Sequence, residues 1–248
     1  MLDKKTPEEI KALKEGGQIL GKVLRTLASQ VRVGVTGRDL NQQAEKLIKE
    51  AGGSPSFKNY NGFPAGLCVS INETVVHGIP SDKPFKEGDL VGLDLGMKYK
   101  GLYTDTATTV AVGKVSKEAE KLLKVTRQAL EVGISEVGPN KYIGDIGRAI
   151  EKFIKPHGYS IVRDLAGHGV GRAVHEDPII PNYDAGGRGE KMFPGLVLAI
   201  EPMIILGKNF RVVVGNNKWD VNSQDGTLTA HFEHTIAVTE DGSLIITK

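Results

Sequence analysis

The chain has 248 residues, 40% of them hydrophobic, which is enough for a large core in one large domain or two small ones. The 32 lysines and arginines against 30 aspartates and glutamates give a net charge of +2, which argues against nucleic-acid and membrane-surface binding. The charged N-terminus does not resemble a secretory signal, and the longest apolar run, 195–206, is interrupted by Glu201 and too short to cross a bilayer. The single cysteine, Cys68, excludes an internal disulfide and fits a reducing cytosol, so we expect a cytoplasmic protein.

Four amphipathic helices are predicted, in two pairs. Thr6 begins a capping box with proline at the first helical position, a second helix follows Thr36 and stops at residues 52–53, Ser116 opens a third, and a fourth ends near Gly158. The apolar positions at helical spacing are, in chain order, Ile10, Leu13, Leu20, Leu24 and Leu27; Leu40, Ala44, Leu47 and Ile48; Leu122, Leu123, Ala129 and Leu130; Ile143, Ile146, Ile150, Phe153 and Ile154.

The segments that follow each helix pair have similar short sequences, which indicates an internal duplication. A Val-His-x-x-Pro segment occurs at 76–80 and again at 174–178, and the second helix of each pair contains Glu-Lys-Leu/Phe-Ile-Lys. Any two α+β halves share part of such a pattern, but a duplication explains more of it. It places Asp94 opposite Glu201, Asp105 opposite Glu233, and His77 opposite His175. We therefore expect an α+β fold with antiparallel sheet, as a single domain over 1–248 with halves of about 1–113 and 114–248.

Five residues, each in or beside a strand-like run, form the candidate site: Asp94, Asp105, His168, Glu201 and Glu233. A carboxylate in a β-branched run is costly to bury unless it is paired or bound to a metal. Four carboxylates and one imidazole make an oxygen-rich ligand set for two divalent ions. His231 and His234 are competing ligands, and only His231 shares a strand face with Glu233.

Asp94 and Asp105 flank a predicted hairpin. A turn at Tyr99 and Lys100 would set the two aspartates directly opposite each other, with Cβ atoms roughly 4.5–5.5 Å apart. Two carboxylates that close repel, so one pKa should rise unless a cation lies between them. The alternative is a solvent-facing pair, but the apolar residues around Asp94 indicate a half-buried strand.

His168 lies in the segment Gly-His-Gly-Val-Gly at 167–171. A phosphate cradle is the alternative explanation of these glycines, but no lysine follows and the spacing fits neither a P-loop nor a dinucleotide fingerprint. We interpret the glycines as allowing the backbone to approach a metal centre.

Taken together, these segments resemble the short, type I methionine aminopeptidases over nearly the whole chain. The resemblance implies the pita-bread (creatinase/aminopeptidase) fold, with two pseudo-symmetric halves around an antiparallel sheet. It implies a metal-dependent hydrolase that removes the initiator methionine when the second residue is small, by attack of a metal-bound hydroxide on the first peptide bond. The implied cofactors are two divalent ions of cobalt, manganese, iron or zinc. The implied partners are N-terminal Met peptides and nascent chains, and hence ribosomes, with no specific nucleic acid and no membrane.

The resemblance also implies a division of labour among the ligands. Asp105 and Glu233 would bridge the two ions, Asp94 would complete one site, and His168 with Glu201 the other. Glu201 would also act as the base that moves the proton of the water.

The remaining implied residues face the substrate. His77 would lie at the scissile amide nitrogen and His175 at the carbonyl oxygen; the alternative is two ordinary strand-end histidines. The methionine pocket would be formed by Tyr60, Phe63, Cys68 and Trp219, although the three aromatic residues could equally be core residues.

Two positions depart from the family pattern at the expected pocket mouth: Asn61, where histidine is common, and Val174, where phenylalanine is common. Three other readings compete. Proline-directed peptidases share the fold but usually carry a further N-terminal domain. Non-enzymatic relatives tend to lose ligands. A storage or structural metal protein predicts a closed coordination shell and no use for His77 and His175.

Overall fold

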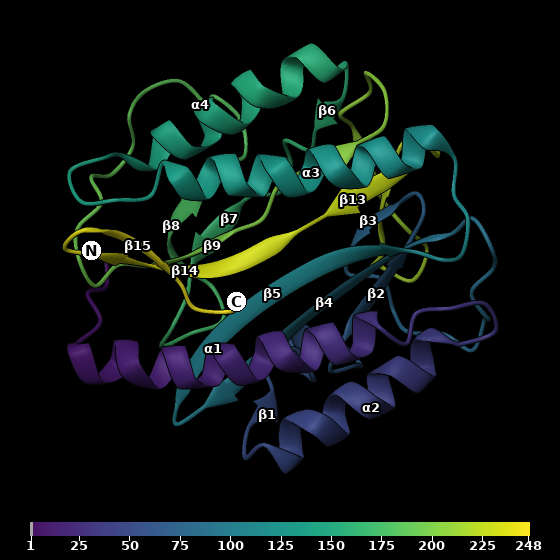
Figure 1. Cartoon of the computed structure of the whole chain (residues 1–248), viewed down its shortest axis with the longest axis horizontal. Coiled ribbons are helices and arrows are strands. Elements are labelled where there is room, and N and C mark those ends of the chain that lie inside the picture. Colours follow the sequence, from purple (N-terminus) through teal and green to yellow (C-terminus); the bar gives the residue numbers. More distant parts are fainter. Residues whose placement is uncertain (1) are drawn as a thin grey trace.

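The computed structural model describes residues 2–248 and arranges two pairs of helices over a central antiparallel sheet (Figure 1). The helices are α1 Pro7–Ala28, α2 Gly37–Glu50, α3 Lys117–Ser135 and α4 Ile143–Ile154, with short 3₁₀ turns η1 Tyr60–Gly62 and η2 Lys155–His157. The strands are β1 Ser54–Pro55, β2 Cys68–Ile71, β3 Thr74–Val76, β4 Leu90–Tyr99, β5 Leu102–Ala111, β6 Ser160–Ile161, β7 Gly167–Gly169, β8 Glu176–Ile180, β9 Val197–Ile200, β10 Met203–Ile205, β11 Val212–Val214, β12 Val221–Ser223, β13 Thr229–His231, β14 Glu233–Thr239 and β15 Gly242–Ile245.

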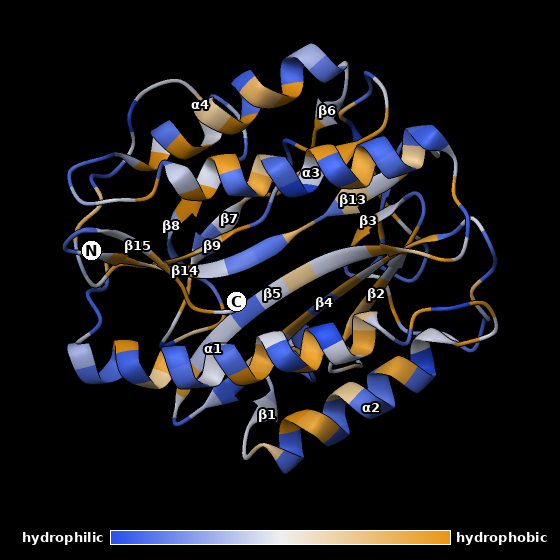
Figure 2. Ribbon diagram, in the orientation of Figure 1, coloured by the Kyte–Doolittle hydropathy of each residue, from blue (hydrophilic) through white to orange (hydrophobic). Residues whose placement is uncertain are grey.

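The helices α1, α2 and α3 begin where the sequence predicts, α2 ends at Glu50 just before the predicted stop, and α4 ends at Ile154 with η2 continuing to His157. Thr6 caps α1 through a reciprocal capping box with Glu9, and Thr36 does the same for α2 with Asp39. The Ser116 hydroxyl accepts from the Ala119 amide at the start of α3. Their apolar stripes turn inward and give each ribbon its alternating colours in Figure 2. None of these helices is both long and apolar enough to cross a membrane, among the residues described.

The described residues form one nine-stranded sheet in the order β1-β4-β5-β14-β9-β7-β8, with β2 added beside β4 and β15 beside β14. Two three-stranded sheets, β13-β10-β6 and β11-β12-β3, lie off this path. Alternation along β4 buries Leu93 and Leu95 in one core cluster with α1 and α2, so Asp94 projects from the other face. The site therefore lies on the face of the sheet opposite the helices.

The two halves repeat the same hydrogen-bonded frame. The Gly88 amide donates to Val112 at 2.9 Å, and the Gly195 amide donates to Val238 at 3.0 Å. Both glycines have a left-handed backbone, with φ of 93° and 94°. Since β5 and β14 pair at the centre of the sheet, β4 and β9 occupy matching places on either side. The predicted α+β pita-bread fold with pseudo-symmetric halves is confirmed.

The predicted hairpin register between β4 and β5 is wrong by two residues. The turn lies at Lys100 and Gly101, both with positive φ (49° and 85°), which suits a tight two-residue hairpin. Asp94 is therefore opposite Ala107, and Asp105 opposite Gly96. A shift of two keeps every side chain on its face, so the aspartates become diagonal rather than direct neighbours on the same face.

Candidate metal centre

All the predicted site residues line one cavity of about 140 Å³. The cavity is lined by Phe57, Tyr60, Asn61, Phe63, Cys68, His77, Asp94, Asp105, His168, His175, Glu201, Trp219 and Glu233. The ligand candidates come from the adjacent strands β4, β5, β14, β9 and β7, whose order in the sheet brings together residues up to 139 positions apart in the chain.

The tightest part of the cluster contains Asp105, His168 and Glu233, whose ligand atoms lie within 4.8 Å of one another. Glu201, directly after β9, places Oε1 3.5 Å from Nε2 of His168. Asp94 joins from β4, beside Asp105. The structure thus brings all five predicted ligands together.

The electrostatics of the carboxylates are unfavourable without a cation. Burial, and next the charge of Glu201, raises the pKa of Asp105 to about 7, and burial raises that of Glu201 to about 7. Burial and the neighbouring carboxylates raise the pKa values of Asp94 and Glu233 well above their usual range. Charges of one sign in a low-dielectric space need either protons or cations.

Three observations show that the residues fit divalent ions. Oδ1 of Asp94 and Oδ1 of Asp105 are buried and have no hydrogen-bond partner among residues 2–248. Nδ1 of His168 lies 2.8 Å from the carbonyl oxygen of Gly169, to which it donates, so Nε2 is left as the free lone pair facing Glu201. Burial lowers the pKa of His168, which keeps that lone pair available. Oxygen-rich sites with one imidazole suit manganese, iron, cobalt or zinc.

The two competing histidines occupy different places. His234 lies on the opposite strand face, where its Nδ1 is 2.9 Å from the Thr247 hydroxyl, so the structure does not bring it to the cluster. His231 is buried with Nε2 3.5 Å from Oε2 of Glu201, and this nitrogen makes no hydrogen bond within the described residues. His231 therefore lies behind Glu201 rather than among the three closest ligand atoms.

His175 and His77 sit at the exposed side of the cavity. The His175 ring is 4.4 Å from the His168 ring, and its Nδ1 is 2.9 Å from the Tyr60 hydroxyl. His77 has a left-handed backbone (φ 60°) and is followed by Gly78, where a Cβ would meet the Val69 carbonyl oxygen at 2.1 Å. This close approach to β2 explains why glycine follows the histidine. Sequence reasoning missed the Tyr60–His175 contact.

An apolar slot adjoins the ligand cluster. Phe63 and Trp219 meet edge to face with ring centroids 5.1 Å apart, and Cys68 lies directly opposite Asp94 in the β2–β4 ladder. Burial and then the Asp94 charge raise the pKa of the Cys68 thiol, which keeps it an apolar wall rather than a nucleophile.

Two residues around this slot were missed or misplaced by sequence reasoning. Phe57 also lines the cavity; its only signal was its position three residues before Tyr60. Asn61, in contrast, is exposed in η1 and lines the cavity, as its predicted place near the mouth requires. Val174 is 4% exposed and packs in the same cluster as Phe63 and Cys68, so its predicted place on the rim is wrong.

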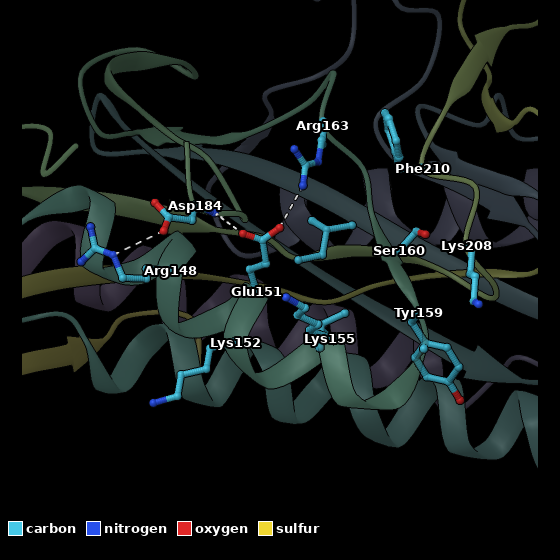
Figure 3. Close-up of a pocket in the computed structure, with 13 residues that line it drawn as sticks. Arg148, Glu151, Lys152, Lys155, Tyr159, Ser160, Arg163, Asp184, Lys208 and Phe210 are labelled. Carbon is cyan, nitrogen blue, oxygen red and sulfur yellow. Dashed lines mark hydrogen bonds and ion pairs between the residues drawn. The ribbon is translucent and has the colours of Figure 1, made fainter. Parts of the chain in front are cut away.

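A larger groove, of about 680 Å³, lies on the outer surface around α4 and β6 (Figure 3). Its two carboxylates are already engaged: Glu151 with Arg163 at 2.9 Å, and Asp184 with Arg148 at 3.6 Å. Lysines and arginines form much of the rest of the lining, so the groove does not suit a cation.

Both fold and ligand cluster define a metallopeptidase: the chain belongs to metallopeptidase family M24, whose family model matches residues 11–240. The resemblance to the methionine aminopeptidases is confirmed by relatives that match end to end. A methionine aminopeptidase of Clostridium perfringens is 42% identical over 247 residues, covering 100% of this chain and 99% of that protein. Methionine aminopeptidase 1 of Bacillus subtilis is 42% identical over 244 residues, covering 98% of each.

Solved structures agree with the sequence comparisons. The methionine aminopeptidase of Thermotoga maritima superposes with a TM-score of 0.97 at 42% identity and covers 100% of both chains. A prolidase of Pyrococcus furiosus superposes with a TM-score of 0.81 at 25% identity, and this chain covers 65% of it. The prolidase and the methionine aminopeptidases thus share this fold, and the three methionine aminopeptidases named here match over their full length.

Proposed function

We propose that this chain uses divalent metal to remove the N-terminal methionine from peptides and nascent proteins whose second residue is small. The observation that carries the proposal is the single cavity in which the five predicted ligands adjoin a closed apolar slot. A slot lined by Phe57, Phe63, Cys68 and Trp219 suits an unbranched, polarizable thioether. The small volume, about 140 Å³, limits entry to the end of a chain and favours an exopeptidase.

We assign the ligands to two ions. Asp105 and Glu233, which come from the two central paired strands and adjoin the other ligands, would be shared by both ions. Asp94 would complete one site, and His168 with Glu201 the other. Two divalent ions held there would lower the pKa of a water between them and polarise the scissile carbonyl.

Glu201 is the proposed base. It accepts the water proton on a carboxylate oxygen and delivers it to the leaving amine, and in this role it is both ligand and proton carrier. His77, which lines the exposed side of the cavity, is the proposed hydrogen-bond partner of the scissile amide nitrogen.

His175 is the proposed donor to the carbonyl oxygen, which gains negative charge during attack. When the Tyr60 hydroxyl donates to Nδ1 of His175, Nε2 carries the proton and can donate to that oxygen. Tyr60 therefore orients the histidine as well as lining the pocket.

A small peptide panel with metal add-back tests the proposal. The metal-free protein should be inactive, and added manganese or cobalt should restore hydrolysis of Met-Ala-x well above Leu-Ala-x and x-Pro-x. Preferred cleavage of x-Pro-x would favour the prolidase alternative, and activity unaffected by chelation would refute the metal mechanism. The same proposal includes two ions per chain, of cobalt, manganese, iron or zinc. It also includes a cytoplasmic location and docking near ribosomes.

A further inference from the structure

We propose that a buried ion pair between Lys5 and Glu176 positions His175, so that the N-terminal segment of the chain is a positioning element of the active site. The inference rests on the proposed role of His175. It concerns two residues outside the cavity, one from the segment before α1 and one at the start of β8.

Lys5 is buried. Its side chain is only 1% exposed, although it lies among charged residues near the N-terminus. An ammonium in such a place must be compensated, and its Nζ contacts Oε2 of Glu176 and lies 3.2 Å from Oδ2 of Asp3. The aliphatic stem lies against Gly171, where a Cβ would meet Cε of Lys5 at 2.4 Å. Glycine at 171 is therefore needed for the lysine to enter.

The other carboxylate oxygen of Glu176 binds the backbone of the loop that carries His175. Oε1 accepts hydrogen bonds from the backbone amides of Arg172 and Ala173, the latter at 2.8 Å. These two amides and Glu176 itself bracket the loop 172–176 that carries His175. One carboxylate thus closes the loop on itself, and Lys5 fixes that carboxylate from outside.

This loop is connected to the strands that carry the metal-ligand candidates. Glu176 pairs with Gly169, the residue after His168, and the Gly171 carbonyl accepts from the Tyr103 amide, two residues before Asp105. The His175 ring is then held against His168 at 4.4 Å and against the Tyr60 hydroxyl. A displaced loop would move Nε2 of His175 away from the reacting carbonyl before it moved the metal ligands on their strands.

Arg172 secures the same segment from the surface. Its guanidinium donates to both oxygens of Glu9 at 2.8 Å and contacts Asp3. The amide of Lys5 donates to the Gly195 carbonyl at 2.8 Å, which ties the segment to the turn before β9. The side chains of residues 3–9 therefore hold the His175 loop, and a backbone hydrogen bond fixes these residues to the rest of the protein.

The test compares Lys5→Met with Lys4→Met, which removes the neighbouring exposed ammonium. In metal-loaded protein assayed well below its unfolding temperature, Lys5→Met should lower kcat by roughly 10-fold, since small misplacements of a positioned group cost rate. KM and metal stoichiometry should stay within about twofold of wild type, and Lys4→Met should behave as wild type. The Arg172 and Ala173 amides should exchange hydrogen faster in Lys5→Met.

Two further variants separate positioning from stability. Glu176→Gln should resemble Lys5→Met, and the double variant should cost no more than either single one, because both break the same contact. In a His175→Ala background, Lys5→Met should lower kcat no further. Lower stability with unchanged kcat would overturn the inference, and so would metal loss in proportion to activity. Failure of wild type to release methionine would instead refute the proposed function, while amide exchange would still report on the loop.

Discussion

The most direct consequence of the buried carboxylates is a pH dependence of stability that appears only when the metal is removed. In the cation-free protein burial raises the pKa of Asp105 from 3.8 to about 7 and that of Glu201 from 4.5 to about 7. A folded-state pKa raised above the unfolded value means that the folded protein holds the proton more tightly. Stability from these groups is therefore fully present below pH ~4 and is lost as the pH rises through ~7.

The magnitude follows from the shift. About three pKa units at 1.36 kcal/mol each correspond to roughly 4 kcal/mol for full ionisation of Asp105 alone. The groups interact, so their contributions do not add, and roughly 4 kcal/mol is a reasonable figure for the cluster. For a chain of this size that is a fall of about 10 °C in unfolding temperature. Bound cations compensate the negative charge, so the metal-loaded protein should not show this fall.

The assay is thermal unfolding between pH 5 and 8.5, with chelator or with saturating manganese. The gap between loaded and chelated protein should widen with pH, since protons compete with metal at the low end. Asp105→Asn is the matched variant: it should lose metal and activity together, yet its metal-free form should be more stable than metal-free wild type at pH 8. Burial lowers the pKa values of His231 and His234 to about 3 and about 4, and such histidines add stability as the pH rises through ~6.5, so the decisive quantity is the difference between metal-free Asp105→Asn and metal-free wild type. If that difference does not grow from pH 5.5 to 8, or if Asp105→Asn is active, the inferred ionisation of Asp105 is refuted.

Three further predictions concern the chemistry and the pocket. His175→Ala should lower kcat by at least ~10²-fold with normal metal content, measured by steady-state kinetics and metal analysis; metal lost in step with activity would make His175 a ligand. Tyr60→Phe should lower kcat about fivefold, the scale of one neutral hydrogen bond, and His175→Ala should abolish that effect in the double variant. Across Met-Gly, Met-Val and Met-Leu peptides kcat/KM should fall in that order, because a bulky second residue displaces the scissile carbonyl; equal values would refute a size-selective rim.

The ligand positions could be predicted from the sequence because their chemistry conflicts with their surroundings. Burying a carboxylate such as Asp94 among Val91, Leu93 and Leu95 costs free energy unless a partner compensates the charge. The residue therefore stands out in the sequence as a candidate ligand. The starts of the helices could also be predicted from the sequence, since Thr6 and Glu9 form a capping box within one turn. Both signals are local.

The supporting contacts could not be predicted, because they join ordinary residues across long separations. Lys5 and Glu176 are 171 residues apart, and neither stands in an unusual sequence context. Val174 looks like any strand valine until the fold buries it. The hairpin register was mispredicted for a different reason. Gly101, with φ of 85°, sets the turn at 100–101, and this local preference outweighs the direct pairing of Asp94 with Asp105 that a turn at 99–100 would give.

The departure from pseudo-symmetry also places the apolar slot beside the ligand cluster. β2 flanks β4 as β7 flanks β9, and the matching amides of Gly88 and Gly195 make Gly92 of β4 equivalent to Ala199 of β9. Ser70 lies opposite Gly92 and His168 lies opposite Ala199, so the first half has a serine where the second half has its imidazole. Cys68, two residues from Ser70 on the same face of β2, lies opposite Asp94, with Phe57 and Phe63 in the same apolar cluster. The first half therefore offers no imidazole beside Asp94. Its buried thiol and aromatic rings form an apolar slot there instead, where the first side chain of a peptide must lie for its carbonyl to reach ions held by the cluster.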